Sequence, residues 1–255
     1  MTETLLITGG ASGIGAETAR LAAARGYRVA INYRSRAAQA QAVVADITAE
    51  GGQAVAFAAD ISREDEIVRL FDETEQALGP ITRLVNSAGI DGGAARAEDF
   101  DAAVLARLFA VNAVGLMLCC REAARRMSPR RGGKGGVIVN LSSMAAATGG
   151  RPRKSHYAAS KAAVDTFTMG FAKEVAREGI RVNSIRPGMI LTEMTEAGLS
   201  DPIARAEVEA TIAMGRVGQA HEIASAILWL LSDESTFISG ATLDAAGGGF
   251  VFGKH

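Results

Sequence analysis

Residues 5–15 read Leu5-Leu6-Ile7-Thr8-Gly9-Gly10-Ala11-Ser12-Gly13-Ile14-Gly15, and an alanine-rich stretch of helical period follows them. This order predicts a glycine loop between a first strand and a first helix. Glycines let the backbone turn tightly and approach phosphate groups closely, and the free N–H groups at a helix start favour an anion. We therefore expect a pyrophosphate site here. The spacing T-G-x-x-x-G-x-G differs from G-x-G-x-x-G, so the motif alone also allows a purely structural turn.

The rest of the chain alternates short Val/Ile/Leu runs with longer alanine-rich segments, which is typical of βαβ units building a parallel sheet. We predict strands at residues 4–8, 28–32, 53–58, 82–86, 136–142, 180–186 and 241–244. We predict helices at 14–26, 37–50, 63–78, 101–127, 156–178 and 219–232, with Gly26 and Gly179 ending the first and the fifth. The expected fold is a single dinucleotide-binding α/β domain over residues 1–255. It is a Rossmann-like, doubly wound parallel sheet of seven strands with helices on both faces.

One segment, residues 189–216, interrupts this rhythm directly after Pro187-Gly188 with Met, Thr, Gly and Asp-Pro. A long interruption of this kind inside a compact domain is often functional. We expect a mobile helical flap over the substrate site.

The composition excludes several classes of protein. Hydrophobic residues make up 48% and charged residues 22%, as in ordinary globular domains, so disordered and fibrous classes are excluded. The net charge of −1 argues against polyanion binding, and the basic residues between 121 and 134 have no interleaved aromatics, so we expect no nucleic-acid partner. The longest apolar runs, such as 226–231, fall far short of the ~18 residues of a membrane span, so we expect no membrane partner.

The cysteines and histidines indicate where the protein works and what it lacks. Cys119 and Cys120 are adjacent and cannot cross-link distant segments, which fits a reducing cytoplasm. His156, His221 and His255 share no ligand-like spacing with one another or with the cysteines, so no metal is expected.

Further motifs follow the glycine loop in chain order. They are Asp60-Ile61, Asn86-Ser87-Ala88-Gly89, Asn112, Asn140-Leu141-Ser142-Ser143, Tyr157-Ala158-Ala159-Ser160-Lys161 and Arg186-Pro187-Gly188-Met189-Ile190-Leu191-Thr192. Together they make nearly the whole chain resemble the short-chain dehydrogenase/reductase family, in particular its NADP-preferring 3-ketoacyl reductase and glucose 1-dehydrogenase-like type. Two features depart from the family's pattern. N-S-A-G stands where N-N-A-G is usual, and the spacing from Ser143 to Tyr157 is one residue longer than the commonest, which concerns the substrate loop.

The pair Tyr157 and Lys161 carries the expected chemistry, because residues four apart in a helix share one face. A phenol with a pKa of about 10 is a poor base at neutral pH, but a nearby ammonium favours the phenolate, so the spacing predicts that Lys161 lowers the pKa of Tyr157. A surface Tyr/Lys pair is the alternative. Ser142 and Ser143 are adjacent at the end of a predicted strand, so only one can face the site. The family's pattern selects Ser143, which would hydrogen-bond the substrate oxygen.

The resemblance implies hydride transfer between a nicotinamide cofactor and a carbonyl or secondary alcohol substrate, with Tyr157 as general acid or base. It implies four catalytic residues, Asn112, Ser143, Tyr157 and Lys161, with Asn112 holding a water in a proton relay and Lys161 also holding the nicotinamide ribose. A capped or solvated Asn112 is the alternative. The implied cofactor contacts are Gly9, Ser12, Gly13, Ile14, Gly15, Tyr33, Arg34, Ser35, Arg36, Asp60, Ile61, Asn86, Ala88, Gly89, Tyr157, Lys161, Pro187, Gly188, Ile190 and Thr192.

The choice of cofactor depends on the end of the second strand, which reads Asn32-Tyr33-Arg34-Ser35-Arg36. A site that prefers NAD usually carries Asp or Glu about 20 residues past the glycine loop, to bind the ribose 2′-hydroxyl. Here two guanidinium groups and a hydroxyl can hold a 2′-phosphate instead. NADP is therefore favoured. If Arg34 and Arg36 only solvate the next helix start, NAD would bind comparably.

Several features leave two interpretations open. His156 either lines the substrate pocket or is a solvated histidine at a helix start. Arg151, Arg153 and Lys154 either draw an anionic substrate toward Tyr157 or form a solvated loop. The fold itself allows a second function, a non-catalytic NADP-sensing binding protein, because a fold does not prove chemistry.

The expected oligomer is a homotetramer, for two reasons. The helix at 101–127 is apolar around much of its circumference, more than one sheet-facing stripe requires. Phe250 and Phe252 near the end of the chain would also be an apolar liability unless another subunit buried them. Tetramers of two-fold symmetry are common in the family that the chain resembles.

Overall fold

A computed structural model describes residues 3–249 of the chain. Its central feature is a seven-stranded sheet in the order β3-β2-β1-β4-β5-β6-β9, and every neighbouring pair runs parallel. The strands are β1 Thr4–Thr8, β2 Arg28–Tyr33, β3 Gln53–Ala58, β4 Ile81–Asn86, β5 Gly136–Leu141, β6 Ile180–Pro187 and β9 Thr242–Ala245. All seven predicted strands are present, each with its ends within one residue of the prediction. The predicted doubly wound α/β fold is confirmed.

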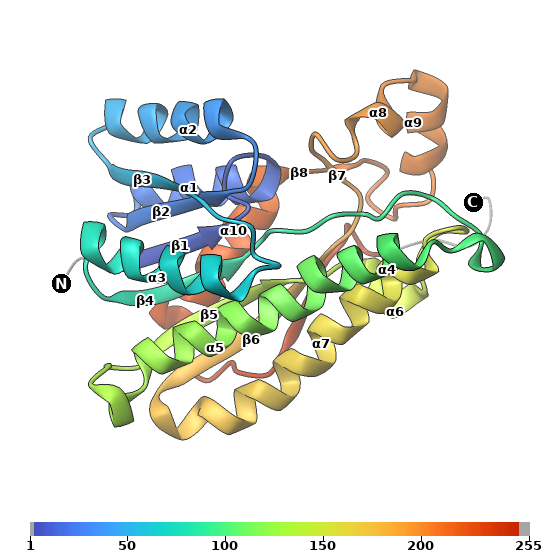
Figure 1. Ribbon diagram of the computed structural model, residues 1–255. Helices are drawn as coiled ribbons and strands as arrows, with labels where there is room; N and C mark the ends of the chain where they lie inside the picture. The colour runs from blue at the N-terminus through green and yellow to red at the C-terminus, as the bar shows by residue number, and fades with distance from the viewer. Residues whose placement is uncertain (1–2, 250–255) are drawn as a thin grey trace.

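Helices cover both faces of this sheet (Figure 1). On one face pack α1 Gly13–Ala24, α2 Ala37–Ala49 and α10 Ala220–Leu231, and on the other pack α3 Glu64–Leu78, α5 Leu116–Met127 and α7 Ser155–Val175. Successive side chains of a strand point to opposite faces, so Leu5 and Ile7 belong to the first core and Leu6 to the second. All three are fully buried, as expected for the central strand of a parallel sheet.

The strand order reverses next to β1, whose two neighbours are β2 and β4. The chain proceeds outward from β1 to β3, returns to β4, and then proceeds outward in the other direction to β9. Connections on the two sides of such a switch point lie on opposite faces, and a crevice opens beyond the carboxyl ends of the strands there. The sheet topology therefore places a ligand site beyond β1 and β4.

The predicted helix at 101–127 is present but is not uniform. The α-helix α4 Ala102–Phe109 continues through a π-helical turn, η2 Ala110–Gly115, into α5. At the end of η2, a Cβ on Gly115 would lie 2.2 Å from the Ile61 carbonyl oxygen, so the close approach of this helix to the chain after β3 requires glycine. Turns of the π type occur frequently at functional sites, and η2 contains Asn112.

The same helical run meets the length and hydropathy criterion for a membrane span, which contradicts the expectation that no stretch approaches one. The run Ala102–Met127 has 26 residues, and it reaches a mean hydropathy of 2.0 because its few polar residues are widely spaced. A buried helix in the core of a compact domain meets the same criterion. Here 44% of the apolar window is buried inside the structure, and α5 contributes to the core beneath the sheet. The absence of a membrane partner stays a prediction.

The segment 189–216 is helical, as expected, and is more regular than its sequence indicates. It contains β7 Ile190–Leu191, α8 Glu196–Leu199 and α9 Pro202–Glu209, and it is followed by β8 Gly218–Gln219, which pairs with β7. Asp201 and Pro202 are the N-cap and first residue of α9, a favoured pair at a helix start. Leu199, Ile212 and Val217 form a small core of their own. Figure 1 shows α8 and α9 standing away from the main sheet.

Short elements complete the fold. They are η1 Ala97–Asp99, η3 Pro129–Arg131, α6 Met144–Thr148, η4 Ala176–Glu178 and η5 Asp233–Ser235.

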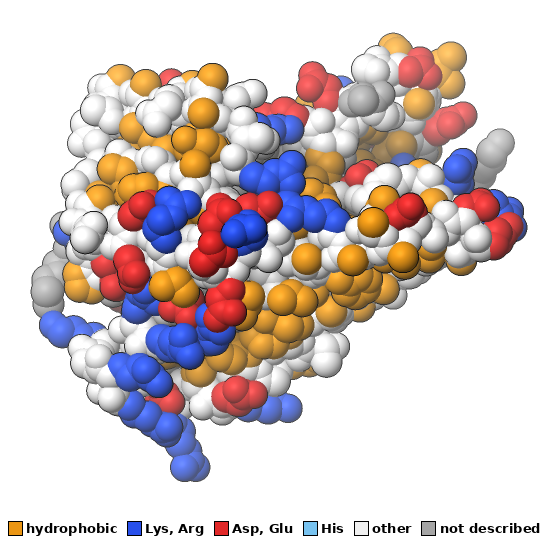
Figure 2. Space-filling view, viewed as in Figure 1, with side chains coloured by type: hydrophobic (Ala, Val, Ile, Leu, Met, Phe, Trp, Pro, Cys, Tyr) orange, Lys and Arg blue, Asp and Glu red, His pale blue; other side chains and the backbone are white. Residues whose placement is uncertain are grey.

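An apolar surface lies over the long helices. Figure 2 shows hydrophobic side chains gathered on the surface over α4, α5 and α7. Val104 and Val114 of the helical run and Met169 of α7 are 44–50% exposed there. Phe250 and Phe252 lie outside the described residues.

Candidate active site

A cleft of about 420 Å³ opens at the carboxyl ends of the strands, at the switch point of the sheet. The predicted site residues that line it are Gly9, Ser12, Gly13, Ile14, Tyr33, Arg34, Ser35, Arg36, Asp60, Ile61, Ala88, Gly89, Ser143, Tyr157, Lys161, Pro187, Gly188, Ile190 and Thr192. Residues that line it without having been predicted are Ala11, Asn32, Ala59, Ser87, Ile90, Arg107, Val111, Leu141, Ser142, Glu193, Met194 and Thr195. Most of the predicted site is thus brought together in one cleft.

The glycine loop packs so closely on neighbouring backbone that side chains at Gly9 and Gly15 would clash with it. Gly9 has a φ of 67°, and a Cβ there would lie 2.7 Å from the Ala88 Cα atom. A Cβ on Gly15 would lie 2.4 Å from the Gly9 carbonyl oxygen, so Gly15 closes the turn from beneath and does not line the cleft. The side chain of Ser12, the N-cap residue of α1, makes no capping hydrogen bond, and the first turn holds no acidic residue. Such a helix start suits a pyrophosphate group, so the residues present fit a dinucleotide.

The end of β2 lines the same cleft. Asn32 of β2 is buried and hydrogen-bonds the residues that follow two neighbouring strands. Its amide donates to the carbonyl oxygen of Ala59, after β3, at 3.0 Å, and its oxygen accepts from the N–H of Gly9, after β1, at 3.4 Å. Arg34 and Arg36 follow as exposed side chains on the cleft wall, and neither forms an ion pair within residues 3–249. Two unpaired guanidinium groups are therefore present where the sequence predicts a phosphate contact.

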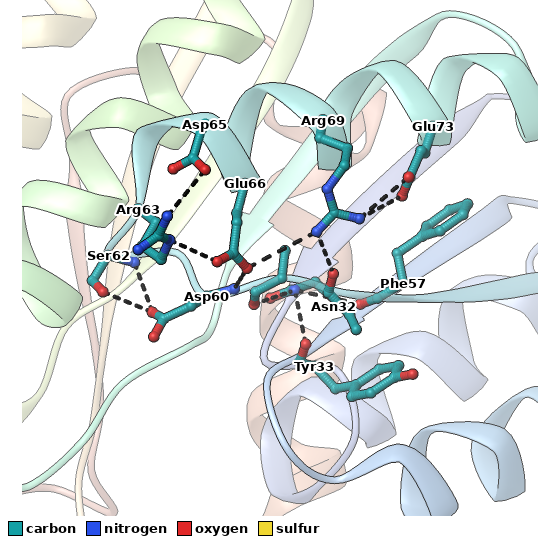
Figure 3. A network of polar contacts seen from close by, with 12 residues as sticks. Asn32, Tyr33, Phe57, Asp60, Ser62, Arg63, Asp65, Glu66, Arg69 and Glu73 are labelled. Carbon is teal, nitrogen blue, oxygen red and sulfur yellow. Dashed lines mark hydrogen bonds and ion pairs between the residues drawn. The ribbon is translucent and has the colours of Figure 1, made fainter.

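Asp60 lies at the cleft end formed by β3, within a polar network (Figure 3). Its carboxylate accepts from the Ser62 N–H at 2.9 Å and from Arg107 Nη2 at 2.8 Å, and its own N–H donates to Glu66 at 2.8 Å. Burial alone would raise the pKa of Asp60, but these hydrogen bonds from Ser62 and Arg107 outweigh it and hold the pKa below its ordinary value. Arg107, whose side chain reaches this loop from α4, carries no sequence signal that predicts this contact.

Tyr157 and Ser143 meet at the other end of the cleft. Ser143 follows β5 directly and caps α6, where its Oγ accepts from the Ala145 N–H at 3.1 Å. Tyr157 comes from the first turn of α7. Burial raises the pKa of Tyr157, a hydrogen bond from Ser143 opposes the rise, and the negative charge of Asp91 adds to it. The phenol is therefore protonated at neutral pH.

Lys161 is buried behind this pair and is held by the backbone. Its Nζ donates to the Leu141 carbonyl oxygen at 2.8 Å, and burial lowers its pKa to about 8 against the opposing charge of Asp165. The expected lowering of the Tyr157 pKa by Lys161 is not seen in the structure: that pKa is raised, chiefly by burial, and the side chains that shift it are Ser143 and Asp91. A Cβ on Gly89 would lie 3.5 Å from Lys161 Nζ, so a glycine keeps this ammonium accessible from the cleft.

Two predicted asparagines lie beneath the cleft and do not line it. Asn112 is fully buried, and its amide donates to the Ile90 carbonyl oxygen at 2.8 Å and to Ser160 Oγ at 3.1 Å. Ser160 Oγ in turn donates to the Tyr157 carbonyl oxygen at 2.7 Å. Asn86 is directed into the core, where its amide donates to Asn140 Oδ1 at 2.9 Å. A polar residue at a strand end can either belong to a buried hydrogen-bond network or line a cleft. The sequence alone does not distinguish these two positions.

Neither interpretation of His156 is correct, because the ring is buried outside the cleft. Its side chain packs edge-to-face on Phe100 with the ring centroids 4.9 Å apart, and within residues 3–249 neither ring nitrogen has a hydrogen-bond partner.

Lys154, a candidate for attracting an anionic substrate, forms an ion pair with Asp91 at 2.6 Å, so its charge is largely compensated. Arg151 and Arg153 stay exposed. Within the described part of the chain, no group of three or more His, Cys, Asp or Glu residues is arranged to hold a metal ion.

Comparison with known proteins agrees with this geometry. Residues 9–249 match the family model described as "Enoyl-(Acyl carrier protein) reductase". The chain is 46% identical over 243 residues to "Uncharacterized oxidoreductase YgfF" of Escherichia coli, covering 95% of this chain and 98% of the relative. It is 38% identical to "3beta-hydroxysteroid dehydrogenase 1" of Eggerthella lenta, with 99% and 97% covered. It is 34% identical to "3-oxoacyl-[acyl-carrier-protein] reductase FabG" of Staphylococcus aureus, with 98% and 99% covered.

Solved structures share the fold over nearly the whole chain. A dehydrogenase/reductase from Sinorhizobium meliloti superimposes with a TM-score of 0.90 at 36% identity, covering 97% of this chain and 95% of that one. A short chain dehydrogenase from Burkholderia cenocepacia in complex with NADP superimposes with a TM-score of 0.89 at 34% identity, covering 96% and 97%.

Proposed function

The chain belongs to the short-chain dehydrogenase/reductase family, and from this premise we propose that it is an NADP-preferring oxidoreductase of a carbonyl or secondary alcohol substrate. The observation that carries the proposal is that Ser143, Tyr157 and Lys161 line the same cleft as the glycine loop. The names of two similar proteins refer to a hydroxyl or an oxo group, on a steroid and on an acyl chain. They support an oxo or hydroxyl group on an acyl chain or a steroid as the reacting group, whereas a sugar substrate of the glucose 1-dehydrogenase-like type rests on the sequence resemblance.

The proposed preference for NADP rests on Arg34, Ser35 and Arg36, which line the cleft at the end of β2. Guanidinium groups bind phosphate oxygens through charge-assisted hydrogen bonds, and no carboxylate in this stretch repels a 2′-phosphate. The structurally similar protein from Burkholderia cenocepacia, which is a complex with NADP, supports the same choice. NAD is the second cofactor to be tested.

In the proposed reaction, a nicotinamide dinucleotide supplies the hydride donor or acceptor when bound. The residues of the chain bind the substrate oxygen and move the proton. For reduction, the Tyr157 hydroxyl donates its proton to the carbonyl oxygen, and Ser143 hydrogen-bonds the same oxygen as negative charge develops on it. The raised pKa of Tyr157, caused by burial, keeps the phenol protonated and suits it to this direction. For oxidation, Tyr157 must first lose its proton, and the resulting phenolate then takes the proton of the alcohol.

Lys161 and Asn112 support these two groups in the proposed site. Lys161 has a pKa of about 8 because it is buried, so at neutral pH it is an ammonium fixed by the Leu141 carbonyl oxygen. It is proposed to hold the nicotinamide ribose from that position. Asn112 is proposed as a positioning residue, because Ser160 connects its amide to the backbone of Tyr157.

Three further proposals concern the molecule around the site. Residues 189–216 form a flap whose Glu193, Met194 and Thr195 contribute one wall of the cleft. The exposed apolar residues Val104, Val114 and Met169 form part of a homotetramer interface. The protein works in the cytoplasm, where the two free buried cysteines stay reduced.

The experiment is a screen of ketones, aldehydes and sugars with both reduced and oxidised cofactors, followed by cofactor absorbance. We expect turnover of a carbonyl or secondary alcohol, with NADP(H) preferred over NAD(H), and loss of that turnover in Tyr157→Phe. Cofactor binding without turnover on any substrate would favour the alternative, a non-catalytic NADP-sensing protein on the same fold.

A further inference from the structure

Glu193 brings a carboxylate to the mouth of the glycine loop. A Cβ built on Gly13 would lie 3.4 Å from Glu193 Oε2, and Gly13 is the first residue of α1. Glu193 lies in the flap directly after Thr192, and both residues line the cleft together with Gly13. Within residues 3–249 the Glu193 carboxylate forms no ion pair. An uncompensated negative charge therefore stands at the start of α1.

The start of α1 is a site that attracts negative charge. Its Ser12 side chain makes no capping hydrogen bond, and its first turn holds no acidic residue, so the free N–H groups are not satisfied from within the helix. The partial positive charge of these groups favours an anion. A pyrophosphate group bound at this helix start would lie beside the Glu193 carboxylate.

We propose that Glu193 is an affinity-determining residue that weakens binding of the dinucleotide cofactor and speeds its release. The inference rests on the proposed function, because it assigns the pyrophosphate to the glycine loop. A carboxylate beside the bound pyrophosphate raises the free energy of the complex by charge repulsion. Product release limits the rate in many enzymes, so weaker binding of the cofactor would allow faster turnover where its release is the slow step.

The position of Glu193 predicts a specific pattern of cofactor dependence. Arg34 and Arg36 lie at the end of β2, whereas Glu193 faces Gly13 at the start of α1. NADPH and NADH share the pyrophosphate and differ only in the 2′-phosphate. Removing the charge of Glu193 should therefore strengthen the binding of both cofactors by the same factor. The ratio of the two dissociation constants should stay unchanged.

The test is a fluorescence titration of the whole protein with NADPH and with NADH, in the wild type and in Glu193→Gln, Glu193→Ala and Glu207→Gln. Glu207 is the matched control, because it is an exposed carboxylate of α9 in the same flap that does not line the cleft. We expect both Glu193 variants to lower the Kd of each cofactor about two- to fivefold, the size typical of one charge near a helix end. We expect the gain to shrink in 0.5 M NaCl, where surface charges are screened. Stopped-flow release should slow by a similar factor.

Three outcomes decide the question. If the wild type binds the cofactors and both Glu193 variants bind them no more tightly than Glu207→Gln, the inference is wrong and the proposed function stands. A gain in Glu193→Gln without one in Glu193→Ala would show a new hydrogen bond from the amide rather than loss of repulsion, and would also overturn it. If the wild type binds neither NADPH nor NADH, the proposed function itself fails.

Discussion

Asn112 and Ile90 hydrogen-bond each other in both directions: the Ile90 N–H donates to Asn112 Oδ1 at 2.9 Å, and the Asn112 amide donates to the Ile90 carbonyl oxygen at 2.8 Å. This pair joins the chain after β4 to the π-helical turn. These hydrogen bonds hold the neighbouring residue Gly89 close to the site. A Cβ built on Gly89 would lie 3.4 Å from Asn112 Oδ1 and 3.5 Å from Lys161 Nζ. The floor of the proposed site is therefore set by hydrogen bonds between the Asn112 side chain and the Ile90 backbone.

Tyr157→Phe should lower kcat by about 10²- to 10⁴-fold, because it removes the proposed proton donor. The Kd of the cofactor should stay within twofold of the wild type, because the glycine loop is untouched. Steady-state kinetics with the best substrate of the screen and a cofactor titration measure the two quantities. A variant that keeps more than about a tenth of the wild-type kcat would refute Tyr157 as the acid or base.

Lys161 should contribute to stability in a pH-dependent way. Its pKa is about 8 in the folded protein, because of burial, and its ordinary value is 10.5. Between these values the unfolded chain binds more protons than the folded one, so this residue's contribution to the free energy of unfolding rises with pH. From pH 7.5 to 10 the rise is about 2 kcal/mol.

Lys161→Met isolates this effect, because methionine does not titrate and fills similar space. Urea unfolding of both proteins at pH 7.5 and pH 10 gives the difference in their free energies of unfolding. We expect the wild type to gain on the variant at pH 10. The titration of Tyr157 and of the buried cysteines occurs in both proteins and cancels in the difference. A difference that does not change with pH would mean that Lys161 has an ordinary pKa.

Arg34→Ala combined with Arg36→Ala should reduce the preference for NADPH over NADH by at least tenfold. A charge-assisted contact to a phosphate contributes about 1.5–3 kcal/mol, and both guanidinium groups line the cleft. Fluorescence titration with each reduced cofactor gives the ratio. Equal affinity of the wild type for the two cofactors would exclude the proposed preference.

Arg107→Met should weaken cofactor binding about three- to tenfold and leave kcat at saturating cofactor nearly unchanged, because Arg107 holds the Asp60 carboxylate at the end of the cleft remote from Tyr157. Arg69→Met is the matched control. Arg69 donates to the Ala58 carbonyl oxygen in the same network but does not line the cleft (Figure 3). An equal loss of affinity in both variants would mean that the whole loop has shifted.

The proposed tetramer should appear in light scattering as a mass near four times the 26.4 kDa of one chain. Val114→Asp with Met169→Asp should reduce this mass, because both side chains belong to the exposed apolar surface. Phe237→Asp, at a fully exposed side chain between α10 and β9, should leave it unchanged. A wild-type mass of one chain would exclude the oligomer, and a stable dimer would leave one interface unsupported.

The strands and most helices could be predicted from the sequence because each is a local pattern. Leu5, Leu6 and Ile7 are apolar on both faces and are bounded by a glycine turn, which describes a central parallel strand without further information. The start of α9 also carried a readable signal, since Asp201 and Pro202 are an N-cap and a first helical residue. That signal lies within the segment predicted as a helical flap without helix bounds.

The parts that escaped prediction depend on contacts between distant segments. Arg107 reaches Asp60, which lies 47 residues earlier, and nothing in either neighbourhood indicates the partner. Asn86 and Asn140 follow strands as cleft residues do, yet they pair with each other inside the core. The pKa of Tyr157 is raised chiefly by its burial, whereas the Tyr-x-x-x-Lys spacing suggests a pKa lowered by the ammonium. Local spacing therefore predicts which residues meet at the site but not the environment that sets their chemistry.

The π-helical turn between Phe109 and Leu116 changes the angular phase of one continuous helix. Each residue of an α-helix adds about 100° of rotation, so one extra residue in a turn presents the following side chains about a quarter-turn away from their α-helical positions. Before the turn, the helix directs Arg107 to the cleft, and after it Leu116 and Cys120 enter the core. Deleting a single residue from 110–115 would let this turn become α-helical and would leave the core-facing stripe of α5 in place, because the wide turn already absorbs one extra residue. The damage from such a deletion would therefore fall on the wide turn that contains Asn112, and not on the core packing of α5.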